Sequence, residues 1–484
     1  MSFPTSAPVN EVVIAAATGA PIAAFYADCA LVGLELGGRA TDRRVGEIIL
    51  GRVRKVERAL AAAFVEIGGN AFGFLNLADA RGLPSPRRLP GEGEAILVQI
   101  SREAEDSKAA KLTASIALPG RTLLYRPHRA GLLVSRRILD ERRRGALLDL
   151  ARSLPQDAGG WFIRRAALAA SPDTMRAEAQ TLLEQWRRLE ERIASTAAPV
   201  RLFRPPDPIL EAVADAAGPD LDRVQADDPG ILNAIRAHCP EIAAWCRLEC
   251  VARPGQVDAA VEAAVSAALE PAVALPGGGA VRISETPALV AIDVDAGNRR
   301  GGAAEDVALA ANLEAVGVLA RQIAVRGLAG HLTIDFIGMR RRAQRERVVA
   351  ALRAAFAEDR QETHVAGYTR LGKVEMMRRR LHGSLRTRLT TTCSGCHGEG
   401  VVLSPEWAAH ASLRAALRTG SEAGAAGAAL VIAAAPGVAD ALRGAAAGAW
   451  ATIERRLGRK VDLREDPTMS ASTFRLETER SAPH

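Results

Sequence analysis

The chain has 484 residues, of which 48% are hydrophobic and 25% are charged. This length and composition predict a globular protein of about three domains with real hydrophobic cores. Six cysteines in so long a chain exclude a disulfide framework. The sequence shows neither a signal peptide nor an apolar span of about 20 residues, so we expect a soluble cytoplasmic protein with no membrane span.

The net charge of +7 favours a polyanionic partner. Nearly all of the positive charge is arginine, because lysine occurs only at positions 55, 108, 111, 373 and 460. Arginine suits bidentate contacts with phosphate, although a GC-rich genome would produce the same bias. Composition alone therefore leaves the phosphate-binding interpretation open.

Two groups of short strands open the chain. Residues 9–36 alternate apolar stretches with turn signals and predict two or three strands of a sheet that is completed elsewhere. Residues 45–113 predict five short strands with glycines at the bends, as a small OB-type barrel requires. Phe64, Phe72 and Phe74 fall in the middle strands, where they either fill the barrel core or stack on RNA bases from an exposed face.

An α/β segment follows at 116–200. We expect a strand near 122–125, a basic turn at 135–137, a helix at 141–153, a strand at 161–167 and a long helix at 173–195. Arg164 and Arg165 leave the end of the second strand, where surface arginines are more often solvated than functional.

A proline-rich break at 204–208 marks a domain boundary. Beyond it we expect helices at 208–217, 228–248 and 255–270, with the N-terminal strands as their packing partner. The cysteines of this region, in the second helix or at its end, are interpreted as small buried hydrophobes. They are Cys239, Cys246 and Cys250.

Three aspartates mark the most informative region, which follows a glycine linker at 276–279. In the strand-like run VAIDVDAG, Asp293 and Asp295 lie two apart and share one face. Asp335 lies in a second apolar run, HLTIDFIGM, where an ionised group is costly unless it is paired or binds a metal. The helical segment between the runs predicts parallel strands, whose sites form at their carboxyl ends. The three carboxylates therefore predict an oxygen-rich site for Mg²⁺.

Two arginine-rich runs follow the carboxylates. The first comprises Arg340, Arg341, Arg342, Arg345 and Arg347, and the second comprises Arg378, Arg379, Arg380, Arg386 and Arg388. Charge runs are usually solvated helix faces. Just downstream of a carboxylate site, however, they are what a nuclease needs to hold a phosphate backbone against an acidic pocket.

The segment CSGCHGEG carries Cys393 and Cys396 at metal-ligand spacing. Structural zinc needs four ligands, so either His397 adds a third within the chain or a second copy of the chain supplies another pair. A thioredoxin-type redox motif is the competing interpretation, and no strand–motif–helix context supports it. A small α/β unit should follow, with a helix at 405–418, a strand near 429–434, a helix near 438–442 and a final stretch at 460–476.

The order of barrel, arginine-bearing segment, two-strand carboxylate site and Cys-x-x-Cys resembles the ribonuclease E/G family of bacterial endoribonucleases over nearly the whole chain. The matching stretches are AAAFVEIGGNAFGFL, VAIDVDAG, ANLEAVGVLARQIAVRGLAGHLTIDFIGM, LGKVEMMRRR and CSGCHGEG. Only a small domain follows the last of these. The resemblance is therefore closer to the ribonuclease G branch than to ribonuclease E with its long scaffold arm.

The resemblance implies a multidomain α/β fold. A split RNase H-like domain receives an inserted OB-fold barrel of the S-one type and a 5′-sensor domain. A DNase I-like catalytic domain, a zinc link and a small α/β domain complete the chain. The implied bounds are 1–44 and 204–275 for the RNase H-like parts, 45–115 for the barrel, 116–203 for the sensor, 276–392 for the catalytic domain, 393–400 for the zinc link and 401–484 for the small domain.

The same resemblance implies that Asp293 and Asp335 are the magnesium-binding pair. One Mg²⁺ would activate a water that attacks a phosphodiester of single-stranded RNA and leaves a 5′-phosphate and a 3′-hydroxyl. The third catalytic position, usually asparagine, is Asp295 here, and this extra carboxylate should strengthen Mg²⁺ binding while repelling the scissile phosphate. Cys393 and Cys396 match a zinc link in which two protomers share one ion through four thiolates, which implies a dimer and a pairing of dimers into a tetramer.

Further residues match the RNA contacts of the family. Phe64 and Phe74 match aromatics that line the barrel's RNA-binding surface, and Lys108 matches a basic neighbour. The implied role is cleavage of RNA in rRNA or tRNA maturation or in mRNA decay. Two alternatives stay open: an RNA-binding protein of the same fold that has lost catalysis, and a zinc-linked structural assembly factor.

The implied pocket for an RNA 5′-monophosphate fits less well. Gly120, Leu124 and Arg164 fall on its positions, but the threonine partner of that arginine is Arg165 here. A second pocket arginine falls at Glu362, whose carboxylate would repel a phosphate. We therefore expect weak or rearranged 5′-end sensing, with internal entry on the RNA or another end chemistry more important than usual.

Overall fold

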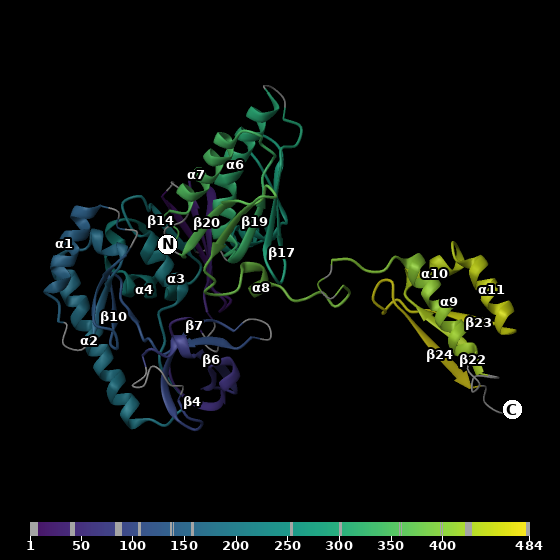
Figure 1. The fold of residues 1–484 in the computed structure, drawn as a ribbon, viewed down its shortest axis with the longest axis horizontal. Coiled ribbons are helices and arrows are strands. Elements are labelled where there is room, and N and C mark those ends of the chain that lie inside the picture. The colour runs from purple at the N-terminus through teal and green to yellow at the C-terminus, as the bar shows by residue number, and fades with distance from the viewer. Residues whose placement is uncertain are drawn as a thin grey trace. The chain divides into compact units, whose positions relative to one another are not determined.

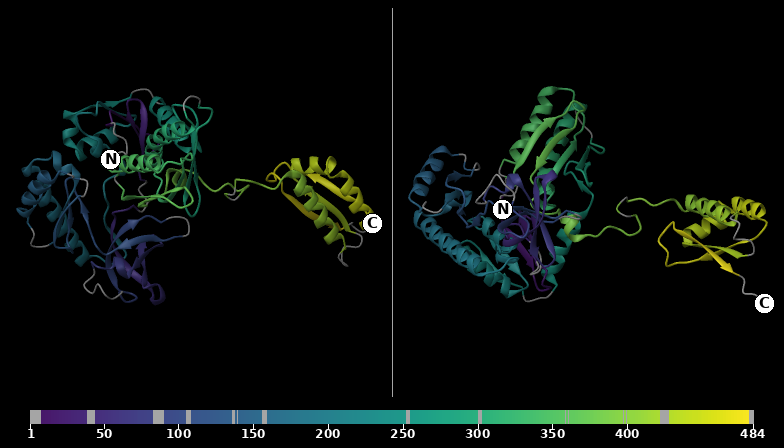
Figure 2. Two further views of the ribbon diagram at one scale, coloured as in Figure 1. Left: turned by 45° about the horizontal axis from the view of Figure 1, so that its top comes forward. Right: turned by 60° about the horizontal axis from the view of Figure 1, so that its bottom comes forward.

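The computed structural model describes residues 8–38, 44–82, 90–104, 108–135, 138, 140–155, 159–251, 255–299, 303–357, 359, 361–396, 398, 400–421 and 428–480. The chain divides into two compact units, Met1–Leu389 and Thr390–His484. Within the described residues the first unit contains four β-sheets and the second contains one. This is a multidomain mixed α/β protein, as predicted (Figures 1 and 2).

The first sheet joins the start of the chain to a segment far along it. Its order is β15-β14-β1-β2-β3, with bounds Arg247–Cys250, Arg223–Ala226, Glu11–Ala15, Ile22–Ala27 and Ala30–Leu36. Strand β1 runs parallel to β14 and antiparallel to β2. Helices α3 (Pro208–Ala216), α4 (Pro229–His238) and α5 (Gln256–Leu269) pack against these strands. The prediction that the N-terminal strands need completion from elsewhere is confirmed.

The second sheet is a closed barrel of five strands, as predicted. It closes because β4 pairs with both β5 and β7. The strands are β4 (Ile48–Glu57), β5 (Ala62–Gly68), β6 (Ala71–Asn76), β7 (Ala95–Arg102) and β8 (Ala110–Thr113), and β13 (Val200–Phe203) adds to the edge of β4. A Cβ on Gly73 would lie 2.5 Å from Leu112 Cδ1. Glycine is therefore required where strands of this small barrel crowd its core.

The third sheet, β11-β12-β10-β9, carries the arginine-bearing segment. Its strands are Gly131–Val134, Gly160–Ile163, Leu123–Arg126 and Leu118–Pro119, and it packs with α1 (Glu141–Arg152) and α2 (Pro172–Ser195). Helix α2 begins after Ser171, whose hydroxyl accepts a hydrogen bond from the Thr174 N–H. Buried Trp161 and Tyr125 pack against each other at a tilt, with ring centroids 4.8 Å apart.

The fourth sheet contains the aspartates and has the order β16-β17-β18-β19-β21-β20. Its strands are Ala272–Ala274, Ala280–Glu285, Val290–Asp295, Gly330–Asp335, Val374–Arg378 and Thr363–Tyr368. Helices α6 (Ala304–Val325) and α7 (Arg342–Ala355) cover one face of this sheet (Figure 1). Helix α6 is long and apolar enough to span a membrane, but 56% of its apolar window is buried, as in the core helix of a folded domain. The predicted parallel strand–helix–strand unit is confirmed.

The second unit folds around its own core. Its sheet has the order β23-β22-β24, with bounds Val461–Glu465, Ala428–Ala434 and Phe474–Arg480. Helices α9 (Pro405–Ser421), α10 (Pro436–Arg443) and α11 (Ala447–Leu457) lie on one face of it (Figures 1 and 2). The sequence did not predict α11.

Two predicted elements were too long. The helix expected at 228–248 ends at His238, and a 3₁₀ turn (Pro240–Ala244) and strand β15 follow. Pro240 explains the break, since a proline disfavours helical geometry in the residue before it. The expected strand at 161–167 ends at Ile163 and gives way to a 3₁₀ turn.

The break at Pro240 also separates the three cysteines of this region. Cys239 caps α4, Cys246 precedes β15 and Cys250 lies in it, so they do not share a helical face. Cys239 is buried, as expected of a small hydrophobe, whereas Cys250 is exposed. Burial raises the pKa of the Cys246 thiol to about 11, which leaves this group protonated and unreactive at neutral pH.

Candidate active site

Asp293 and Asp335 are direct neighbours at the carboxyl ends of two parallel strands. Asp293 is the register partner of Asp335 in the β18–β19 pair. Adjacent strands lie about 4.8 Å apart, and register partners in a parallel pair project from the same face. Two carboxylates held side by side in this way repel each other unless a cation lies between them. The structure therefore brings together the two residues on which the predicted magnesium site depends.

Both carboxylates project from the open face of the sheet. Ile292, Val294 and Ile334 are buried in the core beneath α6 and α7, so the alternate residues point away from those helices. The Asp335 side chain is 43% exposed. The expectation that Asp335 sits among apolar neighbours was therefore wrong, because strand alternation places those neighbours on the opposite face.

Two cationic side chains border the pair. Arg282 on β17 is the register partner of Asp293 on the other side of β18, and its side chain is exposed on the same face. Lys373, directly before β21, forms an ion pair with Asp335 Oδ2. This ion pair is half-exposed, and exposed ion pairs contribute only about 0–1 kcal/mol, so a divalent cation can displace the ammonium.

Asp295 differs from the other two aspartates. Its Oδ1 accepts a hydrogen bond of 2.9 Å from the Gly297 N–H, so one carboxylate oxygen is engaged in the turn that ends β18. Across the described part of the chain, no three His, Cys, Asp or Glu side chains gather closely enough to hold a metal ion. The three aspartates thus do not form the three-carboxylate cluster that their spacing predicted.

A buried asparagine fixes the loop after Asp335, and the sequence reasoning missed it. Asn312 on α6 donates from Nδ2 to the Ile337 carbonyl at 2.9 Å and accepts at Oδ1 from the Ile337 N–H at 3.0 Å. Its side chain is fully buried. The available signal was an amide within the apolar run LAANLEAV, because a buried polar group must find a partner.

The pair fits a hard divalent cation. Both donors are carboxylate oxygens, both are accessible to solvent, and Mg²⁺ binds proteins through one or two carboxylates while keeping several waters. The neighbouring Arg282 and Lys373 can donate hydrogen bonds to an anionic group placed over the ion. The site can therefore hold a metal ion and a phosphate side by side.

The barrel carries a row of basic and aromatic side chains across four strands. Lys55 on β4 pairs with Phe64 on β5, Phe64 pairs with Phe74 on β6, and Phe74 pairs with Lys111 on β8. The two rings pack edge to face with centroids 5.7 Å apart and lie outside the buried barrel core. Phe64 and Phe74 therefore do not fill that core. Lys55 and Lys111 were missed as site candidates because their alignment depends on barrel register.

Other predicted RNA contacts lie at the surface. Lys108 is exposed, and so is Phe72, with 47% of its surface accessible. Phe72 pairs with Glu66 rather than with a lysine. Lys55 and Lys111 pair with Glu57 and Asp79, and such partly exposed ion pairs are weak enough for a polyanion to displace. The row from Lys55 to Lys111 therefore offers two aromatic rings flanked by cations to a polyanion with stacked bases.

The residues predicted for 5′-end sensing meet in part. The Arg164 guanidinium donates to the Gly120 carbonyl, and Leu124 lies on β10 beside them. The carboxylate of Glu178 accepts from both the backbone N–H and the hydroxyl of Thr122, between Gly120 and Leu124. The Glu178 carboxylate thus already accepts the hydrogen bonds that this turn can donate.

The two remaining positions of the predicted sensing pocket are Arg165 and Glu362. The Arg165 side chain, like the basic turn at Arg136 and Arg137, lies outside the described residues. Glu362 is exposed, and its carbonyl accepts from the Arg379 N–H.

Cys393 and Cys396 share one tight turn in the second unit. Hydrogen bonds from the backbone N–H groups of Cys396 and Gly395 and from the Cys396 thiol hold the pKa of the Cys393 thiol below its usual value. Such a turn presents two thiols as metal ligands. His397, the possible third ligand, lies outside the described residues.

The second arginine run is not a uniform phosphate-binding surface. Arg378 is buried and forms a two-pronged ion pair with buried Asp359, at 2.7 and 3.0 Å, and donates to the Leu328 carbonyl at 2.9 Å. Arg380 donates to the Ala329 carbonyl. These two arginines hold the fold together, and Arg379 between them is exposed.

Comparison with known proteins identifies the family. Residues 117–381 match the ribonuclease E/G family. The chain is 31% identical to Ribonuclease G of Haemophilus influenzae over 77% of its own length and 80% of that protein, and 29% identical to Ribonuclease G of Escherichia coli K12 over 89% and 91%. It is 31% identical to Ribonuclease E of Haemophilus influenzae over 78% of its own length and 42% of that protein. The chain belongs to the ribonuclease E/G family of endoribonucleases.

Proposed function

We propose that this protein hydrolyses single-stranded RNA at the Asp293–Asp335 pair with the help of Mg²⁺, leaving 5′-phosphate and 3′-hydroxyl ends. The observation that carries the proposal is the pairing of the two carboxylates in register on the open face of the sheet. Membership of the ribonuclease E/G family supplies RNA as the substrate class. Maturation of rRNA or tRNA, or decay of mRNA, in the cytoplasm is the role that this activity would serve.

Each residue of the site has a distinct task in the proposal. Asp293 and Asp335 would hold the ion, which when bound lowers the pKa of a water and offsets charge on the phosphate. Arg282 and Lys373 would orient the phosphodiester by donating to its non-bridging oxygens. Asn312 would act as a positioning residue, because it fixes the backbone that follows Asp335.

The finer fold assignment is also proposed from the family. It comprises an RNase H-like sheet completed from two segments, an S-one-type barrel, a sensor domain, a DNase I-like catalytic sheet, a zinc link and the small domain. The five sheets of the described residues support this division. We propose the domain bounds given by the sequence, with two strands that pair across them. Strand β13, within the implied sensor segment, adds to the barrel, and β16, within the second RNase H-like segment, adds to the catalytic sheet.

A fluorogenic single-stranded RNA tests the activity. We expect cleavage with Mg²⁺ and none with a chelator, and rates for 5′-monophosphate and 5′-hydroxyl RNA within about tenfold of each other, a difference of about 1.4 kcal/mol. Weak sensing is proposed because Glu178 already occupies the Thr122 turn.

Binding without cleavage would favour an RNA-binding protein that has lost catalysis, which the Lys373–Asp335 ion pair would support. Neither binding nor cleavage would favour a structural assembly factor.

Replacing Phe74 with alanine should weaken RNA binding by roughly five- to 150-fold, because stacking contributes about 1–3 kcal/mol per base. Fluorescence anisotropy at fixed salt measures the effect. Phe72→Ala is the matched control, since Phe72 is exposed on the same strand but lies beside Glu66. Equal losses in the two variants would argue against the row from Lys55 to Lys111 as the RNA path.

Chelation of zinc should dissociate the protein into monomers. We propose that two chains share one Zn²⁺ through Cys393 and Cys396 of each, because this turn supplies two thiols and structural zinc takes four ligands. Light scattering should show a dimer or tetramer for the wild type and a monomer for Cys393→Ser, with about one zinc per two chains before the change. Cys250→Ser, at an exposed cysteine elsewhere, should leave the mass unaltered. An unchanged mass for Cys393→Ser would refute the zinc-linked dimer.

A further inference from the structure

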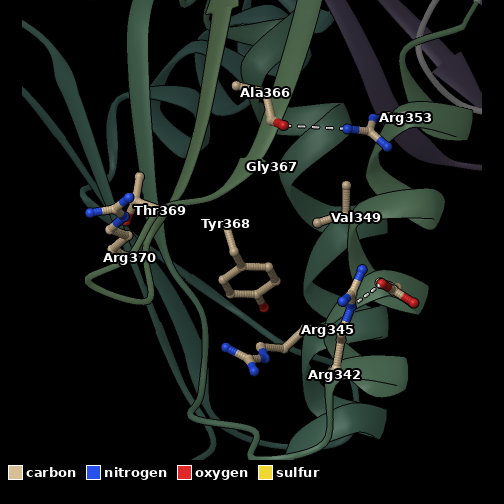
Figure 3. A pocket seen from close by; sticks show the side chains of 10 residues that line it. Arg342, Arg345, Val349, Arg353, Ala366, Gly367, Tyr368, Thr369 and Arg370 are labelled. Carbon is tan, nitrogen blue, oxygen red and sulfur yellow. Dashed lines mark hydrogen bonds and ion pairs between the residues drawn. The ribbon is translucent and has the colours of Figure 1, made fainter.

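An arginine-lined cavity lies at the edge of the fourth sheet, away from the aspartate pair. It has a volume of about 450 Å³ and opens between α7 and the end of β20 (Figure 3). The cationic and aromatic side chains that line the cavity are Arg342, Arg345, Arg353, Tyr368 and Arg370. None of these side chains has a task in the proposed catalytic site.

A break in the pairing of β20 makes room for the cavity. The β20–β21 register shifts between Val365 and Gly367, which forms a bulge. Gly367 adopts a φ of +113°, a conformation that favours glycine, so this position adds no side chain to the wall beside Val349 and Arg353. Arg353 closes one wall by donating to the Val365 carbonyl at 3.2 Å and the Ala366 carbonyl at 3.3 Å.

The cavity carries an excess of positive charge. Four guanidinium groups line it against one carboxylate, Glu346, which pairs with Arg342 at 2.7 Å. Among the described residues, Arg345 and Arg370 have no ion-pair partner. Arg345 is half-buried and lies 5.9 Å from the centre of the Tyr368 ring. Like charges gathered in a partly enclosed space favour binding of an anion.

The Tyr368 hydroxyl is an unused donor in the same cavity. The oxygen is buried and has no hydrogen-bond partner. Burial raises the pKa of this phenol to about 12, although Arg345 opposes the shift, so the group stays protonated and able to donate. Figure 3 shows the ring standing between the α7 arginines and the hairpin, with its hydroxyl toward Arg345. A buried donor without an acceptor is satisfied if a ligand oxygen enters.

We propose that this pocket binds a phosphoryl group of the RNA strand at a point away from the scissile bond. Planar guanidinium groups and a phenol match the oxygens of a phosphate. One short hairpin connects the pocket to the proposed catalytic site, since Arg370 lines the pocket and Lys373 pairs with Asp335. The Thr369 N–H donates to the Lys373 carbonyl at 2.7 Å and closes that hairpin. The proposal rests on the proposed function only in taking RNA as the source of the phosphate.

Binding of uncleaved RNA to the Asp293→Asn protein in chelator tests this site separately from catalysis. Arg345→Gln and Arg370→Gln should each weaken binding about tenfold and reduce the slope of log K against log salt by about 0.7, the value for one lost contact to a single strand. Arg347→Gln is the matched control, because Arg347 is exposed on the same helix but does not line the cavity. Tyr368→Phe, which removes only the hydroxyl, should weaken binding about threefold and keep the fold.

The RNA ends identify which phosphate enters. Equal losses for 5′-hydroxyl and 5′-monophosphate RNA indicate an internal phosphodiester, and losses confined to 5′-monophosphate RNA indicate a terminal phosphate; either result supports the proposal. Losses as large for Arg347→Gln, or no loss for any pocket variant, would overturn it. So would binding of inorganic phosphate to the pocket with RNA affinity unchanged. If the wild type fails to cleave but the pocket variants still bind RNA weakly, the proposed function fails and this inference stands.

Discussion

Replacing Asp293 with asparagine should lower the rate of RNA cleavage by about 10³-fold or more, with RNA binding retained. Asparagine keeps the shape of the side chain and removes the negative charge that a divalent cation needs. Asp335→Asn should behave alike, because Asp335 is the register partner of Asp293 and contributes the second carboxylate. Single-turnover cleavage at saturating protein, with binding measured separately, isolates the chemical step.

Asp295→Asn provides the matched control on the same strand. Asp295 accepts a hydrogen bond from the Gly297 N–H with one carboxylate oxygen, and the side-chain carbonyl of asparagine can accept the same hydrogen bond. We expect this variant to cleave within a few-fold of the wild type, since removing a carboxylate beside the scissile phosphate also removes a repulsion. A loss as large as that of Asp293→Asn would mean that all three aspartates hold the metal.

Replacing Arg378 with methionine should destabilise the first unit by about 3–5 kcal/mol. Arg378 and Asp359 are 4% and 5% exposed, and the substitution removes the guanidinium that donates two hydrogen bonds to the buried Asp359 carboxylate. The Leu328 carbonyl also loses its donor. Urea denaturation measures the loss: the midpoint concentration should fall while the slope of the unfolding free energy against urea stays the same.

Arg379→Met is the control for this substitution, because Arg379 is the exposed neighbour in the same arginine run. Its effect on stability should stay within about 0.5 kcal/mol, as for most surface changes. If Arg378→Met instead left stability intact and weakened RNA binding, the arginine run would be a phosphate-binding surface after all.

Local patterns in the sequence were sufficient for the elements that hold the aspartates. Alternation in VAIDVDAG and HLTIDFIGM, with a helical period between them, identified β18, α6 and β19. The two-residue period also placed Asp293 and Asp295 on one face. What the local pattern could not reveal is which face of the sheet the helices cover, and Asp335 was therefore assigned to an apolar environment that it does not have.

Contacts between distant segments could not be predicted. Lys373 reaches Asp335 across the sheet, and Asn312 holds the backbone after Asp335 from the middle of α6. Lys55 and Lys111 align with the barrel aromatics only because the strands pair in a particular register. Such partners are set by tertiary packing, which leaves no periodic signal in the chain.

The chemistry of the newly formed RNA ends tests the central claim most directly. A uniform single-stranded RNA is incubated with the protein and Mg²⁺, and the products are treated with enzymes that distinguish the ends. Hydrolysis at the Asp293–Asp335 pair predicts 5′-phosphate and 3′-hydroxyl ends whose formation stops in Asp293→Asn. Products with 5′-hydroxyl and cyclic phosphate ends, or cleavage that persists in Asp293→Asn, would contradict it.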